Sequence, residues 1–191
     1  MSSEIEVNRE AGSKPSPDRV RLQTKRLELR PHRAEDFESV CGLWTHPKIV
    51  ARFGGEPRPR MEIWRRMLAY RGHWSLFGWG YWTVRECGSG DFVGELGFND
   101  FRRGIAELEG SPEAGWSLNP EFHGRGYARE AMEAALAWFT HEHGVSRTVC
   151  MIGSDNDPSL KLAQRLAYVP FGTGEYQESE VVFLERVVSD G

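Results

Sequence analysis

The sequence predicts one domain of mixed α/β or α+β class, built as a single layer of sheet with helices on both faces. Three observations lead to this prediction. The chain has 191 residues, which is enough for one domain with a full hydrophobic core. Strand-like and helical patterns follow one another in the order β, α, α, β, β, β, α, β, α, β, β. In the second half, a short strand leads through a glycine-containing turn into a long helix.

The chain begins with a polar stretch that a glycine and prolines interrupt, so we expect residues 1–19 to form a flexible tail. A single domain is expected over residues 20–191. Leucines in a strand-like pattern predict a strand at 20–30, which a proline ends. Apolar residues at helical spacing predict helices at 34–44 and 61–76, separated by a loop that contains glycine and proline.

The remaining elements follow from the same periodicities and from their turn residues. They are strands at 79–85, 92–98 and 114–118, a helix at 127–143, a strand at 145–152, a helix opened by residues 154–158, and strands at 168–171 and 181–187. A glycine-rich turn makes the first two of these strands a hairpin. Gly144 ends the long helix, and Pro158 lies in the first turn of the next one. A polar, glycine-rich link joins the last two strands.

Composition argues against several classes of partner and site. The net charge of −4 argues against a general nucleic-acid or acidic-membrane surface, and no apolar run reaches the ~20 residues of a membrane span. Cys41, Cys87 and Cys150 are far apart and odd in number, which indicates a reducing compartment without a disulfide framework. We therefore expect a cytoplasmic protein. His141 and His143 are two residues apart on a helix and point in different directions, so no metal site is expected there.

Residues 119–130 read NPEFHGRGYARE and contain the strongest local signal. Gly124 and Gly126 stand directly before the long helix, where free backbone N–H groups and the helix dipole attract anions. Glycine also lets the main chain approach a ligand closely, so a pyrophosphate would fit. A dinucleotide fingerprint needs a third glycine where Arg129 stands, and a phosphate loop needs a Gly-Lys pair that the chain lacks. The glycines alone are equally compatible with a plain turn.

The segment EFHGRGYAREA, together with the order of elements, resembles the GNAT N-acetyltransferase superfamily. The acyl-CoA motif of that family is Q/R-x-x-G-x-G/A, and here Glu121, Gly124 and Gly126 occupy its places. Glu121 departs from the usual Gln or Arg, as it does in the RimJ/RimL-like branch. LQTKRLELRPHRAED resembles the first strand of that branch, and SDNDPSLKLAQRLAYV resembles its N-x-x-S helix, with Asn156 and Ser159 in place. The resemblance covers roughly residues 20–188.

This resemblance implies a GNAT-like fold, with a central, mostly antiparallel twisted sheet of about seven strands that splays between its fourth and fifth strands. It also implies an N-acetyltransferase that moves an acetyl group from acetyl-CoA to a primary amine by direct attack. The acceptor would be a protein N-terminal α-amine or a small-molecule amine. Membrane and nucleic-acid partners are not expected, and homodimers are common in this branch.

The resemblance also assigns the cofactor residues. The pyrophosphate would bind to the N–H groups around the glycine turn without a metal, and the pantetheine arm would pass between the splayed strands like an added strand. The turn residues are His123, Gly124, Arg125, Gly126, Tyr127 and Ala128; the arm would contact Trp116, Ser117 and Leu118 on one side and Asn156 and Ser159 on the other. The alternative for Asn156 is a plain helix cap.

Catalysis needs a neutral amine, a donor for the developing oxyanion and a proton for the leaving thiolate. Glu113 is the first candidate base and Glu95 the second, although each could equally be a solvated or salt-bridged strand residue. A main-chain N–H near Ser117 or Leu118 would polarise the carbonyl. Ala163 stands where many relatives have a tyrosine acid, so Ser159 or a water is the expected substitute.

Two other functions stay open. The missing tyrosine and the changed Glu121 leave room for a non-catalytic acyl-CoA-binding or regulatory module on the same fold. A nucleotide-phosphate binder that uses the glycine turn differently is a third hypothesis, although no second phosphate motif accompanies the turn.

Overall fold

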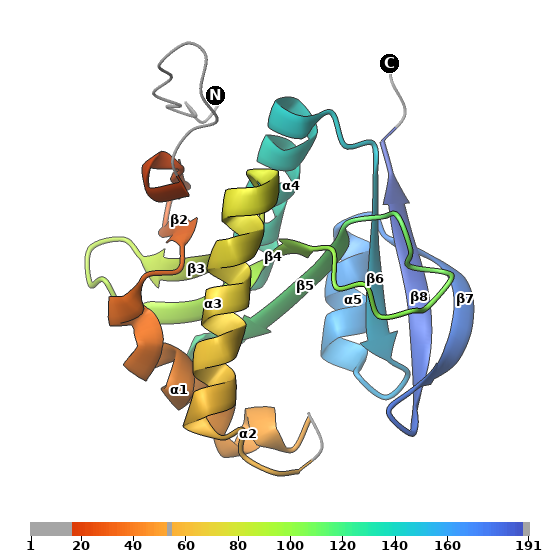
Figure 1. Ribbon diagram of the computed structural model, residues 1–191, viewed down its shortest axis with the longest axis horizontal. Coiled ribbons are helices and arrows are strands. Elements are labelled where there is room, and N and C mark those ends of the chain that lie inside the picture. The colour runs from red at the N-terminus through yellow and green to blue at the C-terminus, as the bar shows by residue number, and fades with distance from the viewer. Residues whose placement is uncertain (1–16, 53–54, 189–191) are drawn as a thin grey trace.

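A computed structural model describes residues 17–52 and 55–188 of the chain (Figure 1). The strands are β1 (Leu22–Gln23), β2 (Leu27–Pro31), β3 (Tyr81–Glu86), β4 (Phe92–Asn99), β5 (Glu113–Leu118), β6 (Arg147–Gly153), β7 (Val169–Tyr176) and β8 (Ser179–Val187). The α-helices are α1 (Phe37–Thr45), α2 (Pro47–Val50), α3 (Arg60–Phe77), α4 (Tyr127–His143) and α5 (Asp157–Arg165). Short 3-10 helices cover Pro17–Arg19, Ala34–Asp36 and Pro120–Phe122.

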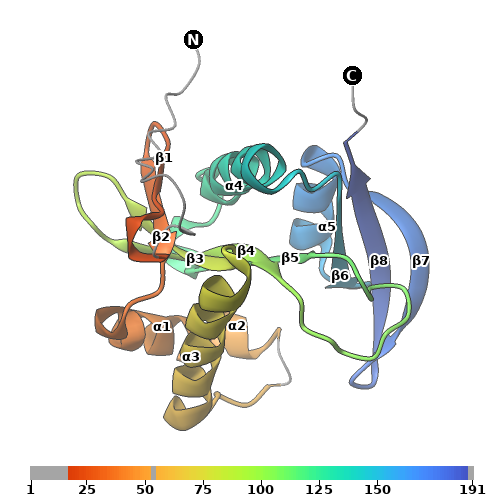
Figure 2. The same cartoon turned by 45° about the horizontal axis from the view of Figure 1, so that its top comes forward.

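All eight strands form one sheet in the order β1-β2-β3-β4-β5-β6-β8-β7. Every neighbouring pair is antiparallel except β5 and β6, which are parallel. Figure 2 shows the two layers of helices: α1, α2 and α3 lie on one face of the sheet, and α4 and α5 lie on the other. The predicted fold class and the mostly antiparallel sheet are confirmed.

The main hydrophobic core lies between the sheet and α4, where large apolar side chains from both elements are buried. Trp82 and Trp74 contact in an edge-to-face arrangement at 4.5 Å, and Trp138 of α4 lies 5.0 Å from Trp82. A second cluster joins α1, α2 and α3 through residues such as Val40 and Ile63. Both faces of the central strands are therefore covered.

The structure corrects several predicted elements. The strand expected at 20–30 is a hairpin, because Thr24 accepts a hydrogen bond from the Leu27 N–H at 2.9 Å and turns the chain. The sheet therefore has eight strands rather than seven. The loop expected between the first two helices contains the short helix α2, and the glycine-rich link near the end is largely strand β7.

The predicted tail at 1–19 lies mostly outside the described residues. Its last three residues, Pro17–Arg19, form a 3-10 helix, and Asp18 pairs with Arg71 of α3 at 3.1 Å. Among the described residues, no helix has both the length and the apolar character needed to cross a bilayer.

Candidate active site

The sheet opens into a gap between its two parallel strands. β5 and β6 share a single pair of partners, Glu113 and Val149 at the start of β5. Beyond this point the two strands diverge, so the C-terminal half of β5 has no partner on its β6 side. The predicted fourth and fifth strands, at 114–118 and 145–152, correspond to β5 and β6, and the predicted splay between them is confirmed.

Main-chain groups of β5 face this gap. The Asn119 N–H donates to the Val93 carbonyl at 2.8 Å, which shows that the main-chain groups of Asn119 point toward β4. Because groups alternate along a strand, the N–H groups of Trp116 and Leu118 turn toward the gap and that of Ser117 turns toward β4. Of the two expected oxyanion donors, Leu118 is thus the one whose N–H faces the gap, and its role stays a prediction.

The glycine turn lies at the open end of β5. Gly124 and Gly126 both have φ of +76°, and a side chain built on Gly124 would meet no atom within 4 Å. Gly126 is the N-cap of α4, and no side chain caps this helix. The first helical hydrogen bond runs from the Glu130 N–H to the Gly126 carbonyl, so the N–H groups before it are available for an anion.

Side chains from distant parts of the sequence hold the turn in place. Arg26 donates to the Arg125 carbonyl at 3.0 Å, and its Nε donates to Glu130 at 2.7 Å. Thr24 also donates to Glu130, at 2.6 Å. Tyr127 donates to Glu86 of β3. Sequence reasoning missed these anchors, because the partners are 41 to 106 residues apart and no local pattern links them.

The predicted turn residue His123 has a role of its own in this arrangement. Its Nε2–H donates to the Leu118 carbonyl at 2.9 Å, which ties the turn to the end of β5. Ala128 lies half-buried in the first turn of α4 and packs against the main core. The predicted cofactor residues from Trp116 to Ala128 therefore lie on β5, in the glycine turn that follows it, and in the first turn of α4.

The other side of the gap is formed by the start of α5. Asn156 is the N-cap of this helix, and its Oδ1 accepts from the Ser159 N–H at 3.4 Å. The Trp116 indole N–H donates to Ser159 Oγ at 3.2 Å and so connects β5 with α5. The capping role considered for Asn156 is thus present. The predicted contact with a pantetheine arm stays a prediction.

Glu113 lies where the two strands meet, at the closed end of the gap. Its carboxylate forms a bidentate pair with Arg103 at 2.9 and 3.1 Å, and Arg103 also donates to the Tyr176 hydroxyl at 2.9 Å. Burial raises the pKa of Glu113 above its ordinary value, although the Arg103 guanidinium acts in the opposite direction. The first candidate base is thus a salt-bridged carboxylate at the closed end of the gap.

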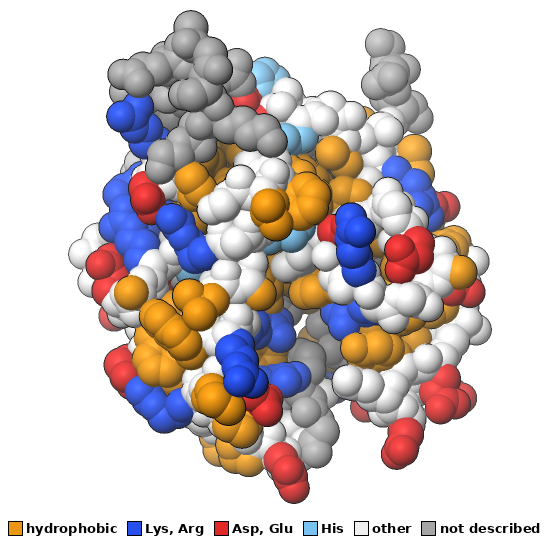
Figure 3. Space-filling view, viewed as in Figure 1, with side chains coloured by type: hydrophobic (Ala, Val, Ile, Leu, Met, Phe, Trp, Pro, Cys, Tyr) orange, Lys and Arg blue, Asp and Glu red, His pale blue; other side chains and the backbone are white. Residues whose placement is uncertain are grey.

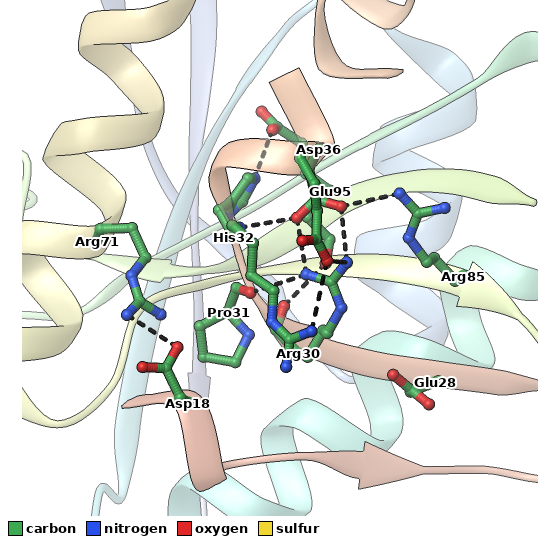
Figure 4. A network of polar contacts seen from close by, with 12 residues as sticks. Asp18, Glu28, Arg30, Pro31, His32, Asp36, Arg71, Arg85 and Glu95 are labelled. Carbon is green, nitrogen blue, oxygen red and sulfur yellow. Dashed lines mark hydrogen bonds and ion pairs between the residues drawn. The ribbon is translucent and has the colours of Figure 1, made fainter. Parts of the chain in front are cut away.

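Glu95 is fully buried on β4, opposite Ser117 of β5. Figure 4 shows the His32 side chain pointing to it, with Nε2 at 2.9 Å, and the Trp44 indole N–H donates to it at 3.1 Å. Burial alone would raise the pKa of Glu95, but the His32 hydrogen bond and the Arg66 charge outweigh it and hold the pKa below its ordinary value. Glu95 is therefore better placed to organise its neighbours than to take a proton directly.

Tyr81 is a further residue of this region that sequence reasoning did not select. A Cβ built on Gly115 would lie 2.0 Å from the Tyr81 hydroxyl, so this hydroxyl lies directly over β5, beside the closed end of the gap. Burial raises the pKa of Tyr81, and its charged neighbours include Arg66, Glu113 and Glu95. The one available sequence signal is the glycine at position 115, which leaves room for the hydroxyl.

A separate cavity of about 260 Å³ lies between α3 and the segment before α1. Its lining combines apolar residues, Trp64, Met67 and Leu68 of α3 among them, with polar ones such as Asp18 and Arg71. None of the predicted site residues lines it. Within residues 17–52 and 55–188, the structure contains no group of three or more His, Cys, Asp or Glu side chains that could hold a metal ion.

Comparison with known proteins adds to this geometry. The acetyltransferase (GNAT) domain model matches residues 26–169. An acetyltransferase of Photorhabdus laumondii subsp. laumondii is 31% identical over 165 residues, covering 86% of this chain and 98% of that protein. A solved structure from Bordetella pertussis, assigned to the GNAT family, superposes with a TM-score of 0.81 at 31% identity, covering 88% of this chain and 100% of that one.

One further solved structure contains a bound ligand. It is RimL, named as a ribosomal L7/L12 alpha-N-protein acetyltransferase in complex with coenzyme A, with a TM-score of 0.71. The match covers 86% of this chain and 96% of that chain, and at 18% identity it shows a shared fold.

Proposed function

Because this chain belongs to the acetyltransferase (GNAT) domain family, we propose that it transfers an acetyl group from acetyl-CoA to a primary amine. The observation that supports this proposal most is the gap between β5 and β6, which opens at the glycine turn and the uncapped start of α4. A long ligand with a diphosphate at one end and a thin arm matches a site of this shape. We place the protein in the RimJ/RimL-like branch on the motifs around Glu121 and Asn156.

In this proposal the pyrophosphate accepts hydrogen bonds from the N–H groups from Gly124 to Ala128, at the positive end of the α4 dipole, since the His123 N–H already donates to the Pro120 carbonyl. The pantetheine arm lies along β5 and uses the main-chain groups of Trp116 and Leu118 that face the gap. The Trp116 indole donates a hydrogen bond to Ser159 of α5 and so lies across the path of the arm. When the arm binds, this side chain either changes its position or packs beside the arm.

The reaction is a direct attack of the amine nitrogen on the thioester carbonyl carbon. The C–S bond breaks, the amine loses a proton and the CoA thiolate gains one. We assign the base to Glu113 and the thiolate proton to Ser159 or a water. The oxyanion is assigned to the gap-facing N–H of Trp116, because Leu118 lies five residues from Glu113, roughly 16 Å along an extended strand. A lysine amine has a pKa of about 10.4 and an α-amine about 7.7–8.0, so an α-amine needs much less help from a base. The ion pairs of Glu113 with Arg103 and of Glu95 with Arg66 therefore favour an N-terminal α-amine as acceptor.

The same ion pairs support a second candidate function, a non-catalytic acyl-CoA-binding module. Both candidate bases already have an arginine partner, and Glu95 is 0% exposed. A module of this kind would bind acetyl-CoA without consuming it.

A turnover assay separates the two functions. The purified protein is incubated with acetyl-CoA and a panel of peptides, amino acids, polyamines and amino sugars, and free CoA is followed with a thiol reagent. We expect amine-dependent CoA release, with a matching mass increase of one acetyl group in the acceptor. Calorimetry with acetyl-CoA, CoA and ATP serves as the binding control. Tight CoA binding without release for any amine would select the module, and equal binding of ATP would contradict both functions.

A further inference from the structure

A row of planar side chains crosses the α3 side of the sheet, and we call it the aromatic–arginine row. It consists of Tyr81, Tyr70, Arg66, Trp44 and Arg58. The two tyrosine rings stack with centroids 4.4 Å apart and an interplanar angle of 6°. The Arg66 guanidinium lies 5.1 Å from the Tyr70 centroid and 4.3 Å from the Trp44 ring. The Arg58 guanidinium lies 5.2 Å from the same Trp44 ring.

The row begins at the proposed reaction centre, because the Tyr81 hydroxyl lies over Gly115 of β5. From there it leads along α3 to the segment just before that helix, where Arg58 stands. Figure 3 shows the molecular surface hollowed beside α3, with Lys and Arg side chains along the hollow. The space in front of β5 on this face is where an acceptor would approach the thioester.

The charges along the row are not balanced. Arg66 Nε lies 3.5 Å from Glu95 Oε1. Arg58 has no carboxylate within ion-pair distance among the described residues, and its buried Nε lacks a hydrogen-bond partner there. Two guanidinium groups on one indole repel each other, and one carboxylate compensates only one of them. Buried donors in native proteins normally have a partner, and an anion bound to the Arg58 guanidinium would supply both a partner and the missing countercharge.

We propose that the acceptor is a peptide N-terminus with an acidic residue among its first few positions, and that Arg58, with Arg66, binds this carboxylate. The inference rests on the proposed function, because it places the acceptor amine at the Tyr81 end of the row. A planar guanidinium on an aromatic ring is well suited to a carboxylate, which it can bind through two parallel hydrogen bonds.

The extent of the row favours a peptide over a free amino acid. Successive groups along it are 4.3 to 5.2 Å apart, and several such steps separate Tyr81 from Arg58. A free amino acid carries its amine and carboxylate only one residue apart, and an extended chain advances about 3.3–3.6 Å per residue. An acidic side chain two to four residues from the amine would therefore reach Arg58.

Matched peptides test the proposal. Tetrapeptide amides with Glu at position two, three or four are compared with the same peptides carrying Gln, using acetyl-CoA and the CoA-release assay. We expect kcat/KM to be about tenfold to a hundredfold higher for Glu at the preferred position, as for hydrogen bonds to a charged group. Equal values for Glu and Gln peptides at every position would overturn the inference. If CoA were released in the absence of any peptide or other amine, this result would instead contradict the proposed function.

Variants then locate the preference. Arg58→Gln should lose the Glu-over-Gln preference, because its kcat/KM for the Glu peptide should fall to the value for the Gln peptide. Arg58→Glu should prefer Lys in place of Glu at the same position, which a merely destabilised protein would not do. Arg65→Gln removes a neighbouring exposed arginine of α3 and serves as the matched control, with the preference retained. A preference that survives in both Arg58 variants would assign the carboxylate site elsewhere.

Discussion

Gly124 combines a backbone conformation that favours glycine with open space where a side chain would stand. Its φ is +76°, and a Cβ there would have no neighbour within 4 Å. Packing therefore does not require a glycine at this position. Gly90, in the turn between β3 and β4, has the same φ of +76° and the same open surroundings. The two positions differ only in where they lie, so Gly90 is a control for backbone strain.

We expect Gly124→Ala to weaken CoA binding about tenfold or more, because a methyl group stands where the diphosphate approaches the main chain. Both Gly124→Ala and Gly90→Ala should lose roughly 1–2 kcal/mol of stability, the cost of a left-handed conformation in an L-residue. Calorimetric titration with CoA and thermal melting measure the two effects. An equal affinity for CoA in both variants would remove the turn from the cofactor site.

Glu113→Gln tests the assigned base. A carboxylate base matters most at the acidic end of the pH range, where the acceptor amine is least neutral, so kcat should fall most there. The measurement is the pH dependence of kcat for one α-amine peptide. Glu107→Gln, an exposed carboxylate in the same β4–β5 connector, is the control. A Glu113→Gln profile with the shape of the native one would leave Glu113 a structural partner of Arg103.

Asp36 is a buried carboxylate that holds two arginines. It accepts two hydrogen bonds from Arg30, at 2.7 and 2.8 Å, and one from Arg85 at 2.8 Å. Burial alone would raise the pKa of Asp36, and the arginines outweigh it, so the pKa lies below the ordinary 3.8. The unfolded chain therefore binds a proton at a higher pH than the folded one. The resulting stability is present above about pH 4 and is lost as the pH falls through the native pKa.

Asp36→Asn should cost roughly 3–5 kcal/mol at pH 7, because it leaves the buried Arg30 with only the exposed Glu35 carboxylate, 3.6 Å away, as a charge partner. It should also flatten the loss of stability below about pH 4, although Glu95, whose pKa is lowered too, retains part of the slope. Denaturant unfolding at several pH values measures both effects. Glu38→Gln, which removes an exposed pair with Arg60, should change stability by no more than about 1 kcal/mol. A similarly small change for Asp36→Asn would refute the assigned role.

Elements with strong local signals were predicted well, and those set by long-range contacts were not. α4 has the predicted bounds, because its start is marked by glycine and its end by Gly144. The hairpin of β1 and β2 was missed because the Thr24 turn depends on its side chain and on Glu130 of α4. On α3, Trp64 and Leu68 share the helical spacing of the apolar residues but are 37% and 52% exposed, because apolar residues occur on several sides of this helix and not in one stripe.

The same division holds for the candidate site. The glycine turn and the Asn156 helix are continuous stretches of sequence, so their residue pattern was sufficient to place them. The match of the GNAT domain model over residues 26–169 confirms the family resemblance that these motifs indicated. The partners of the two carboxylates could not be predicted. Arg103 lies in an irregular connector, and His32 is 63 residues from Glu95.

Variants of Asn156, at the start of α5, can separate its role as the helix N-cap from its proposed contact with the cofactor. Asn156→Ala should lose about 1 kcal/mol of stability with the cap, and Asn156→Ser should keep most of it, because a serine oxygen caps as well. If Asn156 also binds the pantetheine arm, both variants should bind CoA several-fold more weakly, since neither has the amide. Thermal melting and calorimetry measure the two quantities. Native CoA affinity in Asn156→Ser would reduce Asn156 to a cap.

The molecule as a whole consists of two half-sheets, β1–β5 and β6–β8, that meet at one pair of residues. At the closed end the β4–β5 connector packs Leu108 against Val149 and Phe183, and Arg103 donates to Tyr176 of β7. At the open end, the described contacts between strand and helix include the Trp116–Ser159 hydrogen bond. A ligand that fills the gap would therefore connect the two half-sheets at the end where no strand pairing connects β5 with β6.

Acetyl-CoA should stabilise the protein from both sides of the gap at once. At a concentration 100 times Kd, binding adds about 2.7 kcal/mol, which for a chain of this size raises Tm by roughly 5–10 °C. Hydrogen exchange should slow at 114–118, at 123–128 and at 152–156, because these main-chain groups become covered. The β3–β4 turn at 87–91 lies away from the gap and should exchange at an unchanged rate. Protection confined to 123–128 would mean that the nucleotide end binds without the arm, and thioester transfer between the strands would then be excluded.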